Sequence, residues 1–532
     1  MAGDGGRVER SGAVVDTHGP SERSVAQASD PASKVSFARF IFAEAVLLGC
    51  FADVALRTSS LGAGFTLWIA ALVATLLMLA RRGQAKPARE HYAWLLAALL
   101  CSWMFAWRDA ELLQFTNLMA TLVALMLYAM CTAGAPRGSI LDARLRDLLD
   151  AWFRSAKHAL IGLPSLWRDA SMGTAVHATV ARRTPFVRAL VITIPVLLIF
   201  GNLLGSADPV FASLFSLPGV RIDEAISHTV TIAVFTWLCA GSFRGAFVAR
   251  GGRTLPAIAL PRLGTIEITS VLGGLNLLFA LFVGLQLRWL FGGAAVVKAT
   301  TGLTVAEYAR RGFFELVWVA LLAVPVILGT RALIDGDQRA IQRHRRLAFP
   351  LLGFLGAIML SAVLRMRLYV GYYGLTTDRL YALVFMGWLA LVFFFMGATV
   401  LRGWSRPFAA MAVISGYAML GLLNAANPEA IVARAEVNRS GRVRPIDYAY
   451  LATLRGDALP IVARALSSAP ATEESCKAAR QLAERWQVRS DRNIAEWNLG
   501  EARGRKVVAE WLTPHSLRRL CASSGTSPSA SS

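Results

Sequence analysis

The fold is decided by residues 348–401, which read AFPLLGFLGAIMLSAVLRMRLYVGYYGLTTDRLYALVFMGWLALVFFFMGATVL. Two apolar runs, 348–366 and 381–401, each have about the 20 residues that an α-helix needs to cross a bilayer. Between them, residues 365–382 contain four tyrosines and four charged side chains. The pattern predicts two transmembrane helices whose polar connection lies at a membrane boundary, where something is held or sensed.

The rest of the chain repeats this alternation of apolar blocks and polar connections. Of its 532 residues, 55% are hydrophobic and only 17% are charged, which is unusual for a soluble protein of this length. The sequence therefore predicts an all-α, polytopic transmembrane helix bundle. We expect about eleven spans, at 37–56, 61–80, 91–107, 112–133, 186–206, 225–248, 266–287, 313–333, 348–366, 381–401 and 407–425.

The two ends of the chain differ in composition from this membrane part. Residues 1–35 are rich in Gly, Ser, Ala and charge and are predicted to be disordered. The transmembrane domain is predicted over 36–425. A small helical extramembrane domain is predicted over 426–515, and 516–532 is a low-complexity, disordered tail.

The net charge of +21 is concentrated in short connections. Because no basic stripe with interleaved aromatic residues is present, we expect no binding of nucleic acid. Lys and Arg favour alternate connections, beginning with the one between the second and third spans. By the positive-inside rule the N-terminus is cytoplasmic and the C-terminal domain extracytoplasmic, although a miscounted span would reverse the side of that domain.

The basic connection at 141–156 has a pattern of its own. Apolar residues recur there at helical spacing, opposite Arg144, Arg146, Arg154 and Lys157. The pattern predicts a cationic amphipathic helix that lies on the membrane surface or packs on another loop.

Motifs of soluble enzymes are missing from the sequence. No metal-ligand spacing, phosphate-binding loop, nucleophile elbow or dinucleotide fingerprint is found, so we predict no catalytic residue, metal or cofactor, and an enzyme is the less favoured class. Cys476 and Cys521 lie outside the apolar runs, and we predict that they form a disulfide in an extracytoplasmic tail.

The charged residues at membrane boundaries form the predicted ligand site. Glu and Arg residues share one helix face in the segment 306–316, and further charges flank the connection after the ninth span. Guanidinium groups bind phosphate and carboxylate bidentately, so this side favours an anionic ligand. The bland alternative is separate arginines that extend to the headgroups from helix ends. The predicted members are Glu307, Arg310, Arg311, Glu315, Arg365, Arg367, Asp378 and Arg379.

Two acids are candidates for a position inside the membrane. Glu267 begins the seventh span and Glu44 interrupts the first. Ionisable groups at depth are costly and usually face a partner or water, whereas the same residues at headgroup level need no explanation.

Several pieces of the chain resemble a family of uncharacterised bacterial membrane proteins. They are ADPVF at 207–211, EYARRGFFEL at 307–316, RMRLYVGYYGLTTDRLYA at 365–382, NPEAIVARAEVNR at 427–439, and the shorter DYAYL and DALP. The family is the domain of unknown function numbered four-one-seven-three, with relatives under four-one-five-three. The resemblance implies a multi-pass protein of the bacterial inner membrane and supplies no activity.

Three functions remain open on the sequence. The leading hypothesis is a transporter or binding protein for an anionic, envelope-related molecule such as an anionic or lipid-linked compound. The alternative is a membrane sensor or scaffold that contacts a partner protein through its C-terminal domain. A transferase that uses Glu307 as a base is the third. An acid needed at mid-membrane depth would favour the first over the second.

Overall fold

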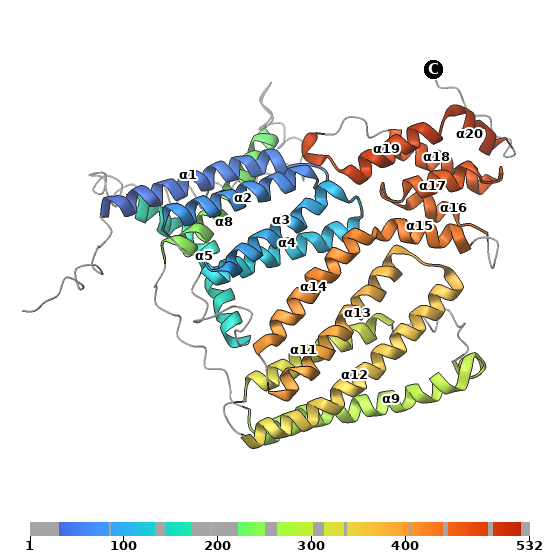
Figure 1. Cartoon of the computed structure of the whole chain (residues 1–532), viewed down its shortest axis with the longest axis horizontal. Coiled ribbons are helices and arrows are strands. Elements are labelled where there is room, and N and C mark those ends of the chain that lie inside the picture. The colour runs from blue at the N-terminus through green and yellow to red at the C-terminus, as the bar shows by residue number, and fades with distance from the viewer. Residues whose placement is uncertain are drawn as a thin grey trace, which may run out of the picture.

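The structure is a computed structural model, and it describes residues 31–84, 87–132, 145–171, 222–249, 263–301, 313–334, 338–403, 406–439, 445–487 and 493–522. In these ranges the chain is helical and contains no strand. Figure 1 shows three groups of helices: the N-terminal helices, the helices from α9 to α14, and a tail that lies at one end of both.

The first group is a packed bundle around one hydrophobic cluster, to which Ile41, Ile69 and Phe105 belong. The helices are α1 (Pro31–Leu56), α2 (Ala63–Arg82), α3 (Arg89–Trp107), α4 (Glu111–Thr132), α5 (Leu145–Ser171) and α8 (Ile222–Phe247).

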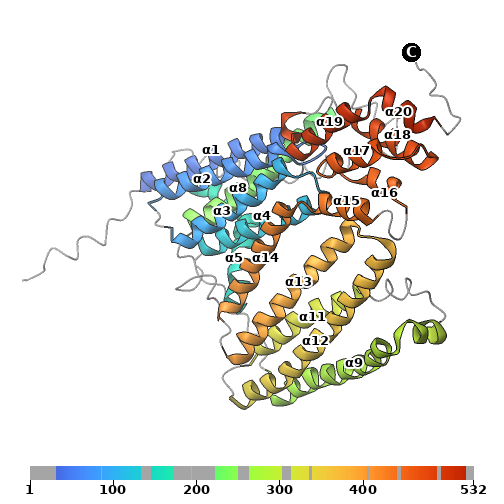
Figure 2. The same ribbon diagram turned by 45° about the vertical axis from the view of Figure 1, so that its right-hand side comes forward.

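The second group has a separate hydrophobic cluster, which includes Leu351, Leu355 and Met396. In both views its helices spread away from the first group (Figure 2). They are α9 (Thr265–Thr301), α11 (Phe313–Ala332), α12 (Gln338–Tyr373), α13 (Thr377–Ala398) and α14 (Arg406–Ala426), with the short η2 (Val400–Arg402) before α14.

Nine helices in the described ranges are long and apolar enough to cross a membrane: α1, α2, α4, α8, α9, α11, α12, α13 and α14. The chain is therefore a multi-pass membrane protein. The predicted span 91–107 coincides with α3, which is not among the nine, because it begins with Arg89 and Glu90 and contains three tryptophans that lower its hydropathy. The fifth predicted span, 186–206, lies outside the described residues.

The tail after α14 is built from short helices around a third hydrophobic cluster, with Leu451, Val462 and Leu482 at its centre. Side chains of Asp447, Asn498 and Thr513 cap three of these helices by accepting a backbone N–H. The elements are α15 (Pro428–Arg439), α16 (Tyr448–Thr453), α17 (Leu459–Ser467), α18 (Glu473–Gln487), η3 (Ile494–Glu496), α19 (Leu499–Trp511) and α20 (Pro514–Cys521).

The tail contacts both helix groups at the same end of the membrane part. η3 packs on α1 and α2, α19 packs on α3, and α15 packs on α13 and α14. Between the groups themselves, α14 packs against α4. We call the helix ends that face the tail the tail end, and the opposite helix ends the far end.

Most of the stretch 365–382, which was predicted to hold a polar connection, is helical. α12 continues to Tyr373 and α13 begins at Thr377, so only 374–376 form the turn. Gly374 has a φ of +88°, a left-handed conformation that favours glycine. A Cβ there would lie 2.7 Å from Oε2 of Glu436, so the tail packs directly on this turn.

The predicted amphipathic segment at 141–156 belongs to a longer helix, α5, of which residues 145–171 are described. It packs on α8 and α1. Gly162 and Gly241 bring the two backbones together, because a Cβ on Gly241 would lie 2.4 Å from the carbonyl oxygen of Ala159. Trp152 and Phe153, on another side of α5, stay exposed (39% and 47%).

Candidate functional site

A layer of buried polar groups joins the tail to the ends of the membrane helices, and we call it the seam. Arg108, in the connection between α3 and α4, is its central cation. Its Nε donates to the carbonyl oxygen of Asn424 at 2.8 Å, and its Nη2 donates to that of Ala425 at 3.4 Å. These carbonyls end α14, where no helical N–H remains to pair with them, so the guanidinium caps that helix.

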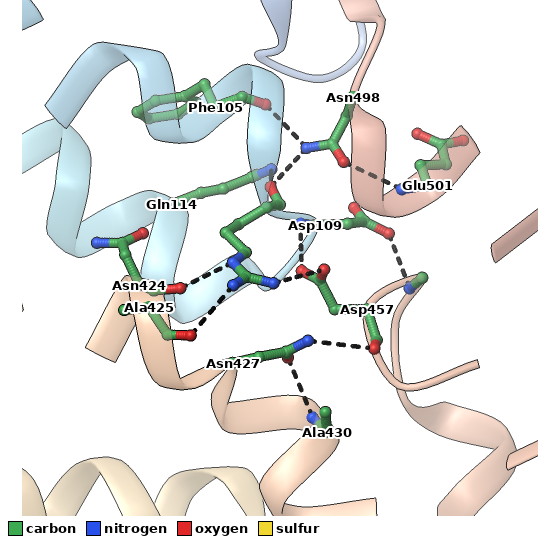
Figure 3. A network of polar contacts seen from close by, with 12 residues as sticks. Phe105, Asp109, Gln114, Asn424, Ala425, Asn427, Ala430, Asp457, Asn498 and Glu501 are labelled. Atoms are coloured by element: carbon green, nitrogen blue, oxygen red, sulfur yellow. Dashed lines mark hydrogen bonds and ion pairs between the residues drawn. The ribbon is translucent and has the colours of Figure 1, made fainter. Parts of the chain in front are cut away.

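Asp457 of the tail binds two of the three residues of the α3–α4 connection, Arg108 and Asp109 (Figure 3). One carboxylate oxygen lies 3.3 Å from Nη1 of Arg108, and the other accepts the backbone N–H of Asp109 at 2.8 Å. In return, the carboxylate of Asp109 accepts the backbone N–H of Gly456 at 3.0 Å. Two short connections that are far apart in sequence therefore recognise each other through reciprocal hydrogen bonds.

Two asparagines complete the seam by capping helices on both sides of it (Figure 3). Asn498 caps α19 by accepting the N–H of Glu501 at 3.0 Å, and its amide donates to the carbonyl oxygen of Phe105 at 2.8 Å. Asn427 has a φ of +56°, and its side chain accepts the N–H of Ala430 at 3.1 Å. It thus ends α14 and begins α15 within one residue.

Two carboxyl groups in the seam have raised pKa values. Burial raises the pKa of Asp109 to about 6, although the Gly456 N–H and Arg455 oppose the shift. Burial likewise raises the pKa of Glu429 to about 7, against the hydrogen bond that its carboxylate accepts from the N–H of Arg455. The desolvation of both acids outweighs their partners, so protons bind to this end of the molecule near neutral pH.

Directly beneath the seam lies an apolar cavity of about 880 Å³ between α3 and α14, and we call it the groove. On α3 it is lined from Ala88 to Trp107, a rise of roughly 28 Å at 1.5 Å per residue, which is close to the hydrocarbon thickness of a bilayer. On α14 it is lined from Ile414 to Ala425. Leu100 and Ile414 are each 54% exposed, so the groove opens sideways towards lipid.

A pair of buried amides forms the groove's wall near the seam. Asn117 of α4 and Asn424 of α14 donate to each other's side-chain oxygen at 3.0 and 3.1 Å. Each also donates to the carbonyl oxygen four residues earlier in its own helix, at 2.8 Å. Tyr417 adds a third link by donating to the carbonyl oxygen of Ala120 at 2.6 Å. The polar groups near the seam are thus satisfied within the protein.

Towards the far end, the groove contains a buried polar group that has no hydrogen-bond partner within the protein. Trp94 is 6% exposed, and its indole N–H has no hydrogen-bond partner. Its ring lies 6.1 Å from that of Tyr417. At the mouth of the groove lie Arg89 and Glu90, one cation and one acid in the first turn of α3. This arrangement suits an apolar chain with a polar head at the far end.

The predicted charged junctions are distributed as follows. Glu307, Arg310 and Arg311 lie outside the described residues, and Glu315 is exposed in the first turn of α11. Arg365 and Arg367 lie in the last turns of α12. Arg379 donates to the carbonyl oxygen of Gly374, and its guanidinium lies 4.1 Å above the ring of Tyr369. Asp378 is exposed beside it, so the shared anion site stays a prediction.

The two acids that were candidates for membrane depth lie in different places. Glu267 is exposed in the first turn of α9, at the far end, which is the headgroup position. Glu44 is half-buried in the middle of α1. In the same helix, Asp53 is 9% exposed and its Oδ2 lies 2.5 Å from Nδ1 of His228 in α8.

The two tail cysteines meet in the structure. Cys476 of α18 and Cys521 of α20 are joined by a disulfide, with their Cα atoms 4.9 Å apart. In the described ranges, no group of three His, Cys, Asp or Glu side chains lies close enough to hold a metal ion.

Sequence reasoning missed the seam and the groove. Arg108 and Asp109 were noticed only as charged residues in a short connection. Two opposite charges within three residues between two spans are nevertheless a usable signal of a polar contact site. Asn117 and Asn424 are amides within apolar spans, which commonly bond across helices. No local sequence pattern identifies Trp94, because whether its indole N–H finds an acceptor depends on how α14 packs beside α3.

Neither the curated proteins nor the solved structures contain a match to the chain. A family model described as a domain of unknown function, DUF4153, matches residues 94–465. The match runs from α3 into α17 and includes Arg108, Asp109 and Asp457, but it ends before both disulfide cysteines. It confirms the expected relation to the family numbered four-one-five-three. Because the model covers well over half of the chain, the chain belongs to the DUF4153 family of unknown function.

Proposed function

We propose that the protein binds an amphipathic membrane molecule in the groove between α3 and α14. The proposal keeps the idea of a lipid-like ligand and moves its site from the charged junctions to the groove. The observation that carries it is the groove itself, an open apolar cavity of about 880 Å³ that extends along the whole of α3.

Physical chemistry supports an apolar chain as the occupant. At hydrocarbon depth a cavity lined by alanine, leucine and methionine is filled neither by water, for lack of polar partners, nor by vacuum, because its walls would lose dispersion contacts. A cavity of this size is within the range of small-molecule sites. The lateral opening gives a membrane molecule direct access from the lipid phase.

A glycine in the groove allows the proposal to be tested without disturbing the fold. Gly421 lines the groove, and a Cβ built on it meets nothing within 4 Å. Gly421→Phe should therefore fill the groove and displace its occupant. Gly284 of α9 has equally open surroundings, is exposed, and does not line the groove, so Gly284→Phe is the matched control.

The measurement is native mass spectrometry of detergent-purified protein, followed by extraction of bound lipid. We expect the wild type and Gly284→Phe to retain about one lipid that Gly421→Phe loses. Equal retention by all three proteins would show that the lipid is bound elsewhere, and the groove would then have no assigned function.

The seam favours a second function, a sensor or scaffold in which the tail acts on a partner. Its buried acids have raised pKa values, and it joins the tail to both helix groups. In that case Gly421→Phe would leave activity in cells intact, while Asp457→Asn, which removes the partner charge of Arg108, would abolish it. A growth or envelope phenotype of the deletion strain, complemented by each variant, separates the two functions.

A further inference from the structure

We infer that the occupant of the groove is a glycerophospholipid with a zwitterionic headgroup, whose phosphate binds at Arg89, whose ammonium group faces Glu90, and whose ester oxygen accepts the indole N–H of Trp94. The inference rests on the proposed function of the groove and specifies the class of ligand. Each of the three contacts is drawn from a side chain that lines the cavity.

Trp94 provides the first step. Trp94 is only 6% exposed and lines the groove, and its indole N–H has no acceptor. An unpaired donor at this depth is costly, because no water is present to satisfy it. Asn117, Asn424 and Tyr417, the polar groups nearer the seam, are already paired within the protein. The missing acceptor is therefore expected from the ligand.

The position of Trp94 identifies that acceptor. Trp94 follows Arg89 by five residues, a rise of roughly 7 to 8 Å along α3. Side chains on a helix point back towards its N-terminus, so the indole lies closer to the mouth than its Cα does. In a glycerophospholipid the ester carbonyls lie just below the phosphate, on the hydrocarbon side. A phosphate at Arg89 thus places an ester oxygen near the indole.

The mouth of the groove favours a phosphate for two reasons. The N-terminus of a helix has a partial positive charge, and the residue that precedes α3, Ala88, has no side chain able to cap it. Arg89 adds a full positive charge on an exposed side chain.

Glu90 decides between an anionic and a zwitterionic headgroup. Its carboxylate lies at the same mouth as Arg89 and is half-buried. A purely anionic headgroup would pair with Arg89 and be repelled by Glu90. A headgroup with a phosphate and an ammonium a few bonds apart is attracted by both side chains, and like-charge repulsion from Glu90 selects against the anionic competitor.

The test uses full-length protein, delipidated in detergent and titrated with three lipids that share the same acyl chains. They are a phosphatidylethanolamine, a phosphatidylglycerol and a diacylglycerol, and binding is read by native mass spectrometry. For the wild type we expect the ethanolamine lipid to bind roughly tenfold more tightly than the other two. Glu90→Gln should remove its advantage over the glycerol lipid.

Two further variants test the remaining contacts. Trp94→Phe keeps an aromatic ring and should weaken all three ester-containing lipids by roughly 3- to 10-fold, the effect of one lost hydrogen bond. Arg89→Gln should weaken both phospholipids but not the diacylglycerol. Arg81→Gln removes an exposed charge from the same end of the molecule outside the groove, and should change nothing.

The outcomes separate this inference from the proposed function. Preference for the phosphatidylglycerol, or a Glu90→Gln variant with unchanged selectivity, would overturn the zwitterionic headgroup while leaving a lipid in the groove. Unchanged affinities in Trp94→Phe would overturn the ester contact. If Gly421→Phe binds all three lipids as the wild type does, the groove is not the lipid site and the proposed function itself fails.

Discussion

Arg108 links three segments of the chain through one side chain. Its guanidinium caps the end of α14 and pairs with Asp457, and its Cζ lies 4.5 Å from the centre of the Trp107 ring. Side chains of Arg108 and Asp457 are only 9% and 7% exposed. A buried pair of this kind contributes little compared with an apolar substitute, but removing one partner leaves a buried charge without compensation.

We therefore predict strong non-additivity between Arg108 and Asp457. Arg108→Ala and Asp457→Ala should each lower the free energy of unfolding by about 3–5 kcal/mol, and the double variant should lose clearly less than their sum. Double-mutant cycles on thermal unfolding in detergent measure the coupling. Arg154 and Asp150, a more exposed pair at 2.8 Å on α5, serve as the control and should couple by less than about 1 kcal/mol. Equal coupling in the two pairs would contradict the prediction.

The raised pKa values of Asp109 and Glu429 predict that the seam is more stable in acid. The pKa values are about 6 and about 7, above the ordinary values of 3.8 and 4.5, so the folded state binds protons that the unfolded chain releases. This stabilisation is complete below about pH 4 and is lost as the pH rises through 6 to 7. At one pKa unit per 1.4 kcal/mol, the loss is on the order of 3 kcal/mol for each group.

Thermal unfolding between pH 5 and pH 8 checks this. Asp109→Asn and Glu429→Gln retain an oxygen for the N–H groups of Gly456 and Arg455, so the double variant should unfold with a flatter dependence on pH. Glu473→Gln, which changes an exposed acid in α18, should leave the wild-type dependence intact. A double variant that keeps the full dependence would show that other groups titrate.

Among the elements, the crossing of α5 and α8 shows how a basic amphipathic helix can become part of the bundle. At the crossing, Trp237 donates to the carbonyl oxygen of Leu160 at 2.8 Å, and Arg244 pairs with Asp169 at 2.7 Å. These polar partners in α8 lie beyond the predicted segment 141–156, on the part of α5 that continues past it. Binding of the isolated 141–156 segment to anionic membranes stays a prediction.

Glycine at this crossing should be intolerant of substitution. Gly241→Ala places a methyl group 2.4 Å from a backbone oxygen of α5, so the helices must separate and we expect a loss of about 1–3 kcal/mol. Gly273→Ala in α9, where a Cβ meets nothing within 4 Å, should be neutral or slightly stabilising because alanine favours helix. Detergent unfolding temperatures of the two variants compare them directly. Equal losses would place the effect outside the crossing.

Much of the element level follows from the sequence. Apolar length predicted helices at ten of the eleven expected spans, because hydropathy is a local property. The connection between the predicted spans 348–366 and 381–401 is shorter than predicted, since tyrosines and arginines near a membrane boundary continue the helices and leave only 374–376 as the turn. The pairing across the seam was beyond prediction, because Arg108 and Asp457 are 349 residues apart and no periodicity relates them.

In the whole molecule, the tail covers one end of two helix groups that have separate hydrophobic clusters. The tail also caps two helix ends of the second group. At the end of α12, Arg439 donates to the carbonyl oxygen of Val370 at 3.0 Å, and at the start of α13, the hydroxyl of Tyr450 accepts the N–H of Thr377 at the same distance. The seam and these caps make the tail a brace across the two groups.

The side of the membrane on which the tail lies remains a prediction, and the basic far end favours an extracytoplasmic tail. We expect Cys476 and Cys521 to resist alkylation in unreduced spheroplasts. Their bond closes a loop of 45 residues, so loss of one cysteine should cost about 4 kcal/mol in the chain-entropy model. Cys50, an exposed cysteine of α1, reports on thiol reactivity within the bilayer. A C-terminal reporter that is active only in the cytoplasm would contradict the orientation.

The distance in sequence between the two sides of the seam is also a delay in time. A ribosome that adds 5–20 residues per second needs roughly 20 to 70 s to synthesise the 349 residues from Arg108 to Asp457. Throughout that interval the α3–α4 hairpin already exists while the carboxylate that will bind it does not. Closure of the tail end is therefore among the last steps of biogenesis, and a nascent chain arrested before residue 457 should carry Arg108 without its carboxylate partner.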